Sequence, residues 1–140
     1  MQVAEATPDE GEIPGEAVLT GTNGVEVLSA ARLSKEQTRA RNKETLLEII
    51  NSTELSDAQK QEAVDSMVRM TDIAEKEAAA EVLLQAKGVG EAVVSINGDA
   101  VDVVVNAAEL TDVQRAQIED IVKRKTDIAA ENIVISTIAQ

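Results

Sequence analysis

Reactive and bulky side chains are missing from this chain, which has no His, no Cys and no Phe, Tyr or Trp among its 140 residues. Without His and Cys it lacks the commonest general base, the commonest metal ligand, the strongest protein nucleophile and any disulfide. The core must be aliphatic, and each large side chain contributes roughly 1.5–3 kcal/mol when buried. We therefore expect a small structural domain with no catalytic residue, no cofactor and no metal site.

The charge balance excludes further classes of partner. Acidic residues outnumber basic ones by 26 to 13, and a net charge of −13 disfavours nucleic acid and anionic membrane surfaces. No stretch approaches the roughly 18 apolar residues of a membrane span, and no signal-peptide core is visible. Attachment to a membrane would therefore need an N-terminal anchor that this chain does not contain.

Residues 1–30 differ in composition from the rest of the chain. They hold six acidic residues, both prolines, four of the seven glycines and no Lys or Arg. Such a composition is typical of a flexible acidic linker, which leaves 31–140 as the folded domain. A weak hairpin about Thr22-Asn23-Gly24 is the alternative, although two isolated strands are marginal in water.

The dipeptide Asn97-Gly98 stands between two β-rich runs and predicts a two-residue hairpin turn of type I′. The pairs expected across it are Ile96 with Asp99, Val94 with Val101 and Ala92 with Val103. One face of the hairpin then holds Ala92, Val94, Ile96, Val101, Val103 and Val105. The opposite face is mixed and more polar, so the valine-rich face should lie on the core.

Helix starts are indicated by a pattern that occurs three times, Leu-[Ser/Thr]-x-x-Gln at 33–37, 55–59 and 110–114. In such a capping box the hydroxyl and the Gln side chain satisfy each other's backbone N–H groups. The pattern predicts helices over about 35–51, 57–87 and 111–125. A strand rich in β-branched residues follows at 132–138.

This order of elements, helix–helix–strand–strand–helix–strand, predicts an α+β fold. Two or three helices should pack on one face of a three-stranded mixed sheet. The last strand should run parallel to the second hairpin strand through a right-handed crossover, although the sequence does not say which strand it pairs with.

Several charged or small residues have both a structural and a functional interpretation. Arg39, Arg41 and Lys43 could form a solvated basic face or dock on an acidic partner. Ala78, Ala79 and Ala80 could pack against the sheet or contact another subunit. The carboxylates of Glu75, Glu77 and Glu81 are expected on exposed helix faces, where nothing would shift a pKa for acid–base chemistry. Gly88-Val89-Gly90 follows a helix and is interpreted as a turn rather than a phosphate loop.

Four blocks carry a family resemblance: S-K-E-Q-T-R-A-R-N-K-E (34–44), E-K-E-A-A-A-E-V-L-L-Q-A-K-G (75–88), V-V-V-N-A-A-E-L-T-D-V-Q-R-A-Q-I-E-D-I-V-K-R-K-T (103–126) and A-A-E-N-I-V-I (129–135). They resemble the stage III sporulation protein AH family of endospore-forming bacteria. The resemblance implies a domain like the ring-building motif of type III secretion ring proteins. It also implies a location between mother cell and forespore, with a single anchor in the mother-cell membrane.

The resemblance further implies a partner, the forespore membrane protein stage II sporulation protein Q, with which the family spans the two membranes as a channel. Self-association into a ring is a second implication. We expect an edge strand to extend a sheet with the partner, through residues Ile133, Val134, Ile135 and Ser136. Two alternatives remain: a homo-oligomeric extracytoplasmic module without a hetero-partner, and a small-ligand binder or enzyme regulator.

Overall fold

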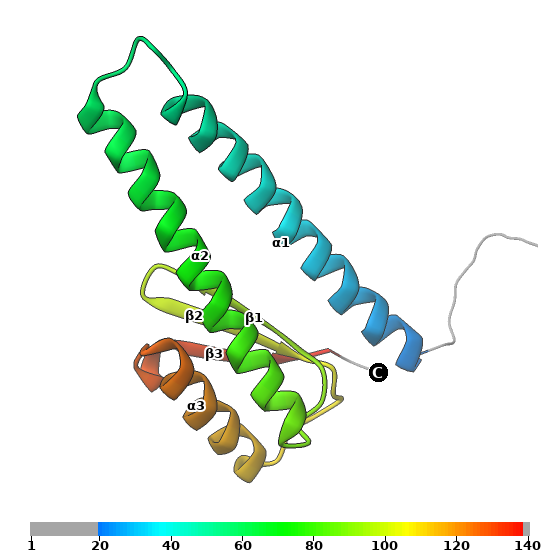
Figure 1. Cartoon of the computed structure of the whole chain (residues 1–140). Helices are drawn as coiled ribbons and strands as arrows, with labels where there is room; N and C mark the ends of the chain where they lie inside the picture. Colours follow the sequence, from blue (N-terminus) through cyan, green and yellow to red (C-terminus); the bar gives the residue numbers. More distant parts are fainter. Residues whose placement is uncertain (1–19, 139–140) are drawn as a thin grey trace, which may run out of the picture.

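The computed structural model describes residues 20–138, and its elements occur in the expected order (Figure 1). Helices α1 (Thr20–Ile50) and α2 (Asp57–Ala86) are followed by strands β1 (Ala92–Asn97) and β2 (Ala100–Val105). Helix α3 (Asp112–Thr126), a short 3-10 turn (Ala130–Asn132) and strand β3 (Ile133–Thr137) complete the chain. The sheet order is β1-β2-β3, with β2 antiparallel to β1 and parallel to β3, so the α+β class and the mixed sheet are confirmed.

The hairpin keeps the predicted faces but not the predicted pairs. Ile96 pairs with Val101, Val94 with Val103 and Ala92 with Val105, so the predicted register was wrong by two residues. The loop is Gly98-Asp99, and Gly98 has a φ of 62° while Asp99 does not have a positive φ. A positive φ at the first loop residue alone is characteristic of a type II′ turn, which favours Gly there. Because side chains alternate with a period of 2, a shift of two residues leaves each face unchanged.

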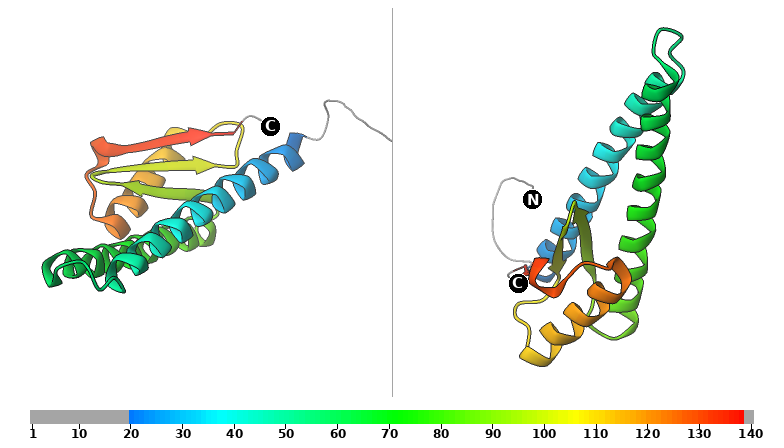
Figure 2. Two further views of the ribbon diagram at one scale, coloured as in Figure 1. Left: turned by 90° about the horizontal axis from the view of Figure 1, so that it is seen from above. Right: turned by 90° about the vertical axis from the view of Figure 1, so that its left-hand side faces the viewer.

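Helices α2 and α3 cover one face of the sheet and enclose the core with it (Figure 2). The valine-rich face supplies one side of this core, and Leu84, Ile118 and Val122 are fully buried on the other. Among the described residues, no α1 side chain belongs to this cluster. Helix α1 instead lies beside α2 and along β1, and the two long helices meet at the end that points away from the sheet (Figures 1 and 2).

Two of the three predicted capping boxes are confirmed. Ser56 Oγ accepts from Gln59 N at 3.2 Å while Ser56 N donates to Gln59 Oε1 at 3.0 Å, and Thr111 and Gln114 repeat the arrangement at α3. The third prediction, a helix start at Ser34, is wrong because Ser34 lies inside α1. After Gly24 no Gly or Pro interrupts the helix, so the chain never leaves it to form a cap.

The start of α1 also corrects the interpretation of the N-terminal region. The hairpin predicted about Thr22-Asn23-Gly24 is wrong, because these residues are helical. Residues 20–30 belong to α1 rather than to a linker, and Leu28 within them is only 1% exposed. The rest of the predicted linker, residues 1–19, lies outside the described residues, so the division into linker and domain stays a prediction there.

Candidate functional site

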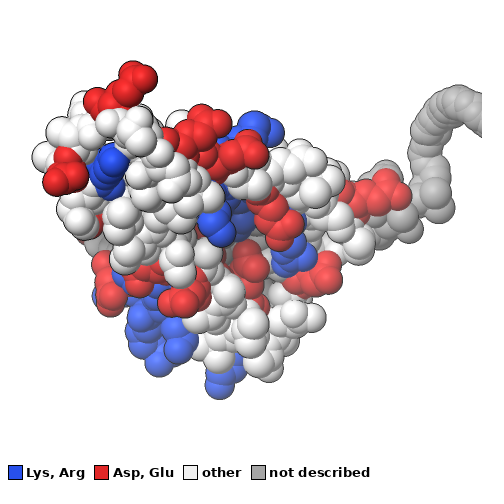
Figure 3. Space-filling view, turned by 45° about the horizontal axis from the view of Figure 1, so that its top comes forward, with Lys and Arg blue, Asp and Glu red and all other residues white. Residues whose placement is uncertain are grey.

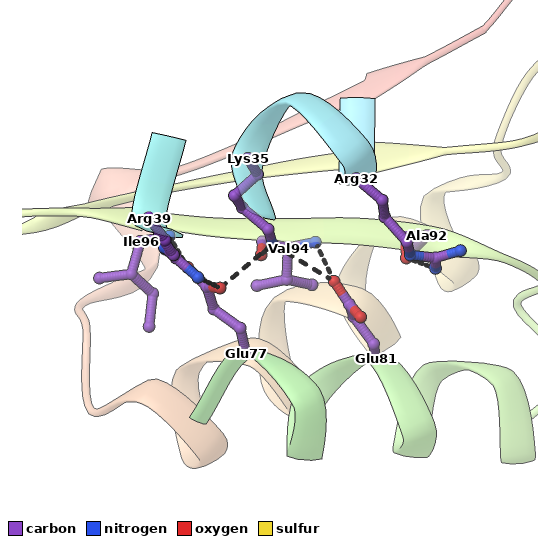
Figure 4. Close-up of polar contacts among 8 residues, drawn as sticks. All are labelled: Arg32, Lys35, Arg39, Glu77, Glu81, Ala92, Val94 and Ile96. Atoms are coloured by element: carbon purple, nitrogen blue, oxygen red, sulfur yellow. Dashed lines mark hydrogen bonds and ion pairs between the residues drawn. The ribbon is translucent and has the colours of Figure 1, made fainter. Parts of the chain in front are cut away.

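The outer edge of β1 is covered by charged side chains from two helices (Figure 4). From α1, Arg32 Nη2 donates to Ala92 O and Lys35 Nζ donates to Val94 O, each at 2.8 Å. From α2, carboxylate oxygens accept the N–H groups of the same strand; these bonds are Val94 N to Glu81 Oε2 at 2.8 Å and Ile96 N to Glu77 Oε2 at 2.7 Å. Backbone groups that a further strand would use are therefore bonded to side chains.

Glu77 is the centre of this arrangement. Its side chain is 3% exposed, and its oxygens accept from Arg39 Nη1 at 2.6 Å, Arg39 Nη2 at 2.8 Å and Lys35 Nζ at 3.1 Å. The two Arg39 bonds form a bidentate pair, which is the strongest carboxylate–cation geometry. Burial alone would raise the pKa of Glu77, but hydrogen bonds from Arg39 and from the Ile96 N–H, together with the Lys35 charge, lower it below its ordinary value.

Helical spacing places the charged side chains of α1 and of α2 along the β1 edge. Arg32, Lys35 and Arg39 are three or four residues apart, which places them on one face of α1, and we call them the basic row. Glu77 and Glu81 are one turn apart on α2. The N–H and C=O of Val94 both point away from β2, as those of alternate residues do in an antiparallel pair. The basic row and the two carboxylates therefore meet along the β1 edge.

A groove lies between α1 and α2 next to this edge, with a volume of about 580 Å³. Its apolar wall comes from Met67, Met70, Ala74 and Ala78, and charged side chains of both signs border it. On the face drawn in Figure 3, Lys and Arg are intermixed with Asp and Glu rather than gathered into an area of one sign. The groove is therefore bordered by positive and negative side chains together.

The three residues of the predicted basic cluster, Arg39, Arg41 and Lys43, have different surroundings in the structure. Arg39 is bonded to Glu77 within the molecule, so it is not a free docking residue, and the prediction for it is corrected. Arg41 is exposed, and its guanidinium donates to Thr38 Oγ1 of its own helix at 3.4 Å, while Lys43 is exposed at the groove. A sequence pattern cannot show that one of three neighbouring cations has a partner 38 residues away.

The predicted alanine contact is divided in the same way. Ala78 and Ala79 are exposed, but Ala80 is fully buried in the core and cannot contact another subunit. These successive residues point in directions about 100° apart around the helix, so only part of such a run can lie on one surface.

Strand β3 lies at the other edge of the sheet, and no further strand within residues 20–138 pairs with it. Ile133 is 8% exposed and belongs to the core, and Ile135 packs against the core. Val134 is 53% exposed, and Ser136 is exposed on the same side. The predicted edge strand therefore exists, with alternate residues facing solvent.

Sequence reasoning missed Arg32, Lys35, Glu77 and Glu81 as a structural group. The expectation that Glu77 is exposed is wrong, because Arg39 and Lys35 compensate its burial. The i, i+4 spacing of Glu77 and Glu81 was the available signal, but it indicates a shared face and not what covers that face.

Within residues 20–138, no three metal-ligating side chains are grouped to hold an ion, and no helix there has the length and hydropathy to cross a membrane.

Comparisons with known proteins agree with this fold. A family model described as SpoIIIAH-like protein matches residues 2–135. The chain is 26% identical over 108 residues to stage III sporulation protein AH of Bacillus subtilis (strain 168), covering 77% of this chain. The chain spans about half the length of that relative, since the match covers 50% of it.

Solved structures give two further similarities. A chain of the SpoIIQ–SpoIIIAH pore-forming complex superposes with a TM-score of 0.73 at 23% identity, over 81% of this chain and 98% of that one. The type III secretion protein EscJ of enteropathogenic E. coli gives a TM-score of 0.45 at 24% identity, over 64% and 62% of the two chains. The first superposition shows that the fold is shared.

Proposed function

The chain belongs to the SpoIIIAH-like protein family, and from that premise we propose that it is a non-enzymatic structural component of a sporulation channel. Its partner would be a forespore membrane protein like stage II sporulation protein Q, since a protein of the same fold occurs in a complex with SpoIIQ. The domain would lie between mother cell and forespore, held by an N-terminal anchor in the mother-cell membrane. The aliphatic composition and the absence of His and Cys fit a binding role rather than a catalytic one.

The difference between the two sheet edges carries this proposal. Four outward groups of β1 are each bonded to a charged side chain, whereas β3 ends the sheet with Val134 and Ser136 exposed. An open edge strand can accept a strand of another protein, with main-chain hydrogen bonds for affinity. We propose that Ile133, Val134, Ile135 and Ser136 pair with the partner, with Arg41 and Lys43 available for a separate charged contact.

Binding can be tested by sedimentation velocity with interference optics, because the chain has no Trp or Tyr to absorb. The chain would be mixed with the soluble domain of the partner, and we expect a 1:1 complex. Val134→Lys should weaken it at least about tenfold, since charge on an edge strand opposes pairing. The matched control is Val113→Lys, which makes the same change at a 78% exposed site on α3. Equal affinities for the two variants would exclude β3 as the binding edge.

Self-association into a ring is the second proposal, and the exposed apolar residues of α2 favour it. Val82 is 68% exposed beside Ala78 and Ala79, and these residues line a hollow of about 410 Å³ with Lys125 of α3. Tethering to a membrane raises the effective concentration of a weakly associating domain. A chain that associates alone and forms no mixed species with the partner would favour a homo-oligomeric module instead.

A further inference from the structure

The first half of α1 is attached to the domain through the polar groups of the basic row and through the buried side chain of Leu28. The core cluster contains no α1 residue among those described, and Leu28 is the fully buried large side chain of this helix. The basic row supplies the hydrogen bonds from α1 to β1 and to Glu77. The domain core can therefore keep its packing when this half of α1 moves away.

The basic row covers backbone groups that are arranged for strand pairing. Ala92 O, Val94 O, Val94 N and Ile96 N are four outward groups of β1, and each has one charged side-chain partner. These partners take the place of a fourth strand, and covering an edge in this way prevents edge-to-edge association. Removal of α1 would free both carbonyl groups and leave Glu77 without its two cations.

The side chains of the basic row can separate from β1 and Glu77 into solvent. The Lys35 and Arg39 side chains are 19% and 27% exposed, so both cations can be hydrated without passing through the core. Glu77, in contrast, is buried and cannot reach water unless α1 moves. The covering of the two β1 carbonyl groups therefore depends on one face of α1, while the N–H groups of Val94 and Ile96 are bonded to carboxylates of α2.

We infer that the β1 edge is a second strand-pairing surface, which the basic row covers and which the β3 edge of a second copy of this chain fits. β1 has six residues and β3 has five, so the two edges are similar in length. β3 has the sequence I-V-I-S-T, with no charged residue in a chain of net charge −13, so it approaches the β1 edge without charge repulsion. Pairing between opposite edges of one sheet is a head-to-tail contact that can repeat from copy to copy.

This pairing does not depend on the hetero-partner, although both need β3. A chain whose β3 edge is occupied by a partner strand could still accept β3 of another copy at its own β1 edge. It could not donate its own β3, so a bound partner would end a row of copies at that point.

The test is the variant Lys35→Gln/Arg39→Gln, compared with Arg41→Gln/Lys43→Gln on the same helix. Both remove two positive charges, but the control residues bond neither to β1 nor to Glu77. Hydrogen–deuterium exchange would follow the outward amides of Val94 and Ile96. The amides of Val93 and Ser95, which point toward β2 in the antiparallel pair, report whether the sheet stays folded.

We expect the outward amides to exchange at least about tenfold faster in the basic-row variant only. Its sedimentation coefficient should rise with concentration, and adding Val134→Lys should abolish that rise while exchange stays fast. Unchanged exchange, fast exchange without association, or association that survives Val134→Lys would each overturn the inference. If the inner amides also lose protection, sedimentation of Arg32→Met replaces the exchange measurement, because this variant frees Ala92 O while Glu77 stays paired. A sedimentation coefficient that does not rise with concentration would then overturn the inference.

Discussion

Replacing Glu77 with Gln tests whether the charged arrangement stabilises the fold. The Gln side chain has a similar shape and keeps an oxygen that can accept the Ile96 N–H, so the backbone bond can survive. What it loses is the negative charge shared by Arg39 and Lys35, which approach it to 2.6 and 3.1 Å. The substitution therefore isolates the ionic part of the site.

The expected magnitude follows from burial. Removing one partner of a buried ion pair costs about 3–5 kcal/mol, because the remaining charge is left without compensation. Here Arg39 and Lys35 are 27% and 19% exposed and can turn partly toward water. We therefore expect the free energy of unfolding to fall by about 2–3 kcal/mol, a large part of a typical total of about 5–15 kcal/mol.

Urea unfolding followed by far-UV circular dichroism would measure this change, since the chain has no Trp or Tyr to report by fluorescence. The matched control is Glu75→Gln, the same substitution on the same helix at an exposed site, expected within about 0.5 kcal/mol of the unsubstituted chain. Glu77→Ala should cost about 1–3 kcal/mol more than Glu77→Gln, because the Ile96 N–H then has no acceptor. Equal midpoints for Glu77→Gln and Glu75→Gln would refute the reasoning.

Three further predictions concern acid, packing and capping. Because the pKa of Glu77 is lowered on folding, its contribution to stability is present above about pH 4.5 and is lost as the pH falls below that value, so the difference in unfolding free energy between the unsubstituted chain and Glu77→Gln should shrink only there. Ala80→Leu should destabilise the chain by about 1–3 kcal/mol by overpacking the core, whereas Ala79→Leu should leave the thermal midpoint nearly unchanged; similar midpoints would contradict the burial of Ala80. Thr111→Ala should lower the free energy of unfolding by about 1 kcal/mol through the lost cap of α3. Thr111→Ser, which keeps the hydroxyl, should retain that stability, and Val113→Ala is the control in the same turn; a loss in Thr111→Ser as large as in Thr111→Ala would show that the hydroxyl is not responsible.

Features that depend on neighbouring residues could be predicted from the sequence. The boxes at Ser56 and Thr111 act within one helical turn, so they could be recognised without the fold. The faces of the hairpin follow from the alternation of its side chains, and the order of elements follows from these local patterns. The four sequence blocks were sufficient for the family, which the match over residues 2–135 confirms.

Features that depend on residues distant in the chain become visible in the folded molecule alone. Leu28 is buried and the basic row bonds to β1, so α1 runs from Thr20 through the predicted cap at Ser34. The pairing of Arg39 with Glu77, 38 residues apart, buries a carboxylate that its helix alone would leave in water. The two edges of the sheet differ because α1 and α2 cover one of them, which no local pattern specifies. Local signals fix where elements begin and which faces are apolar, whereas the pairing of charges across the fold decides which edge stays open.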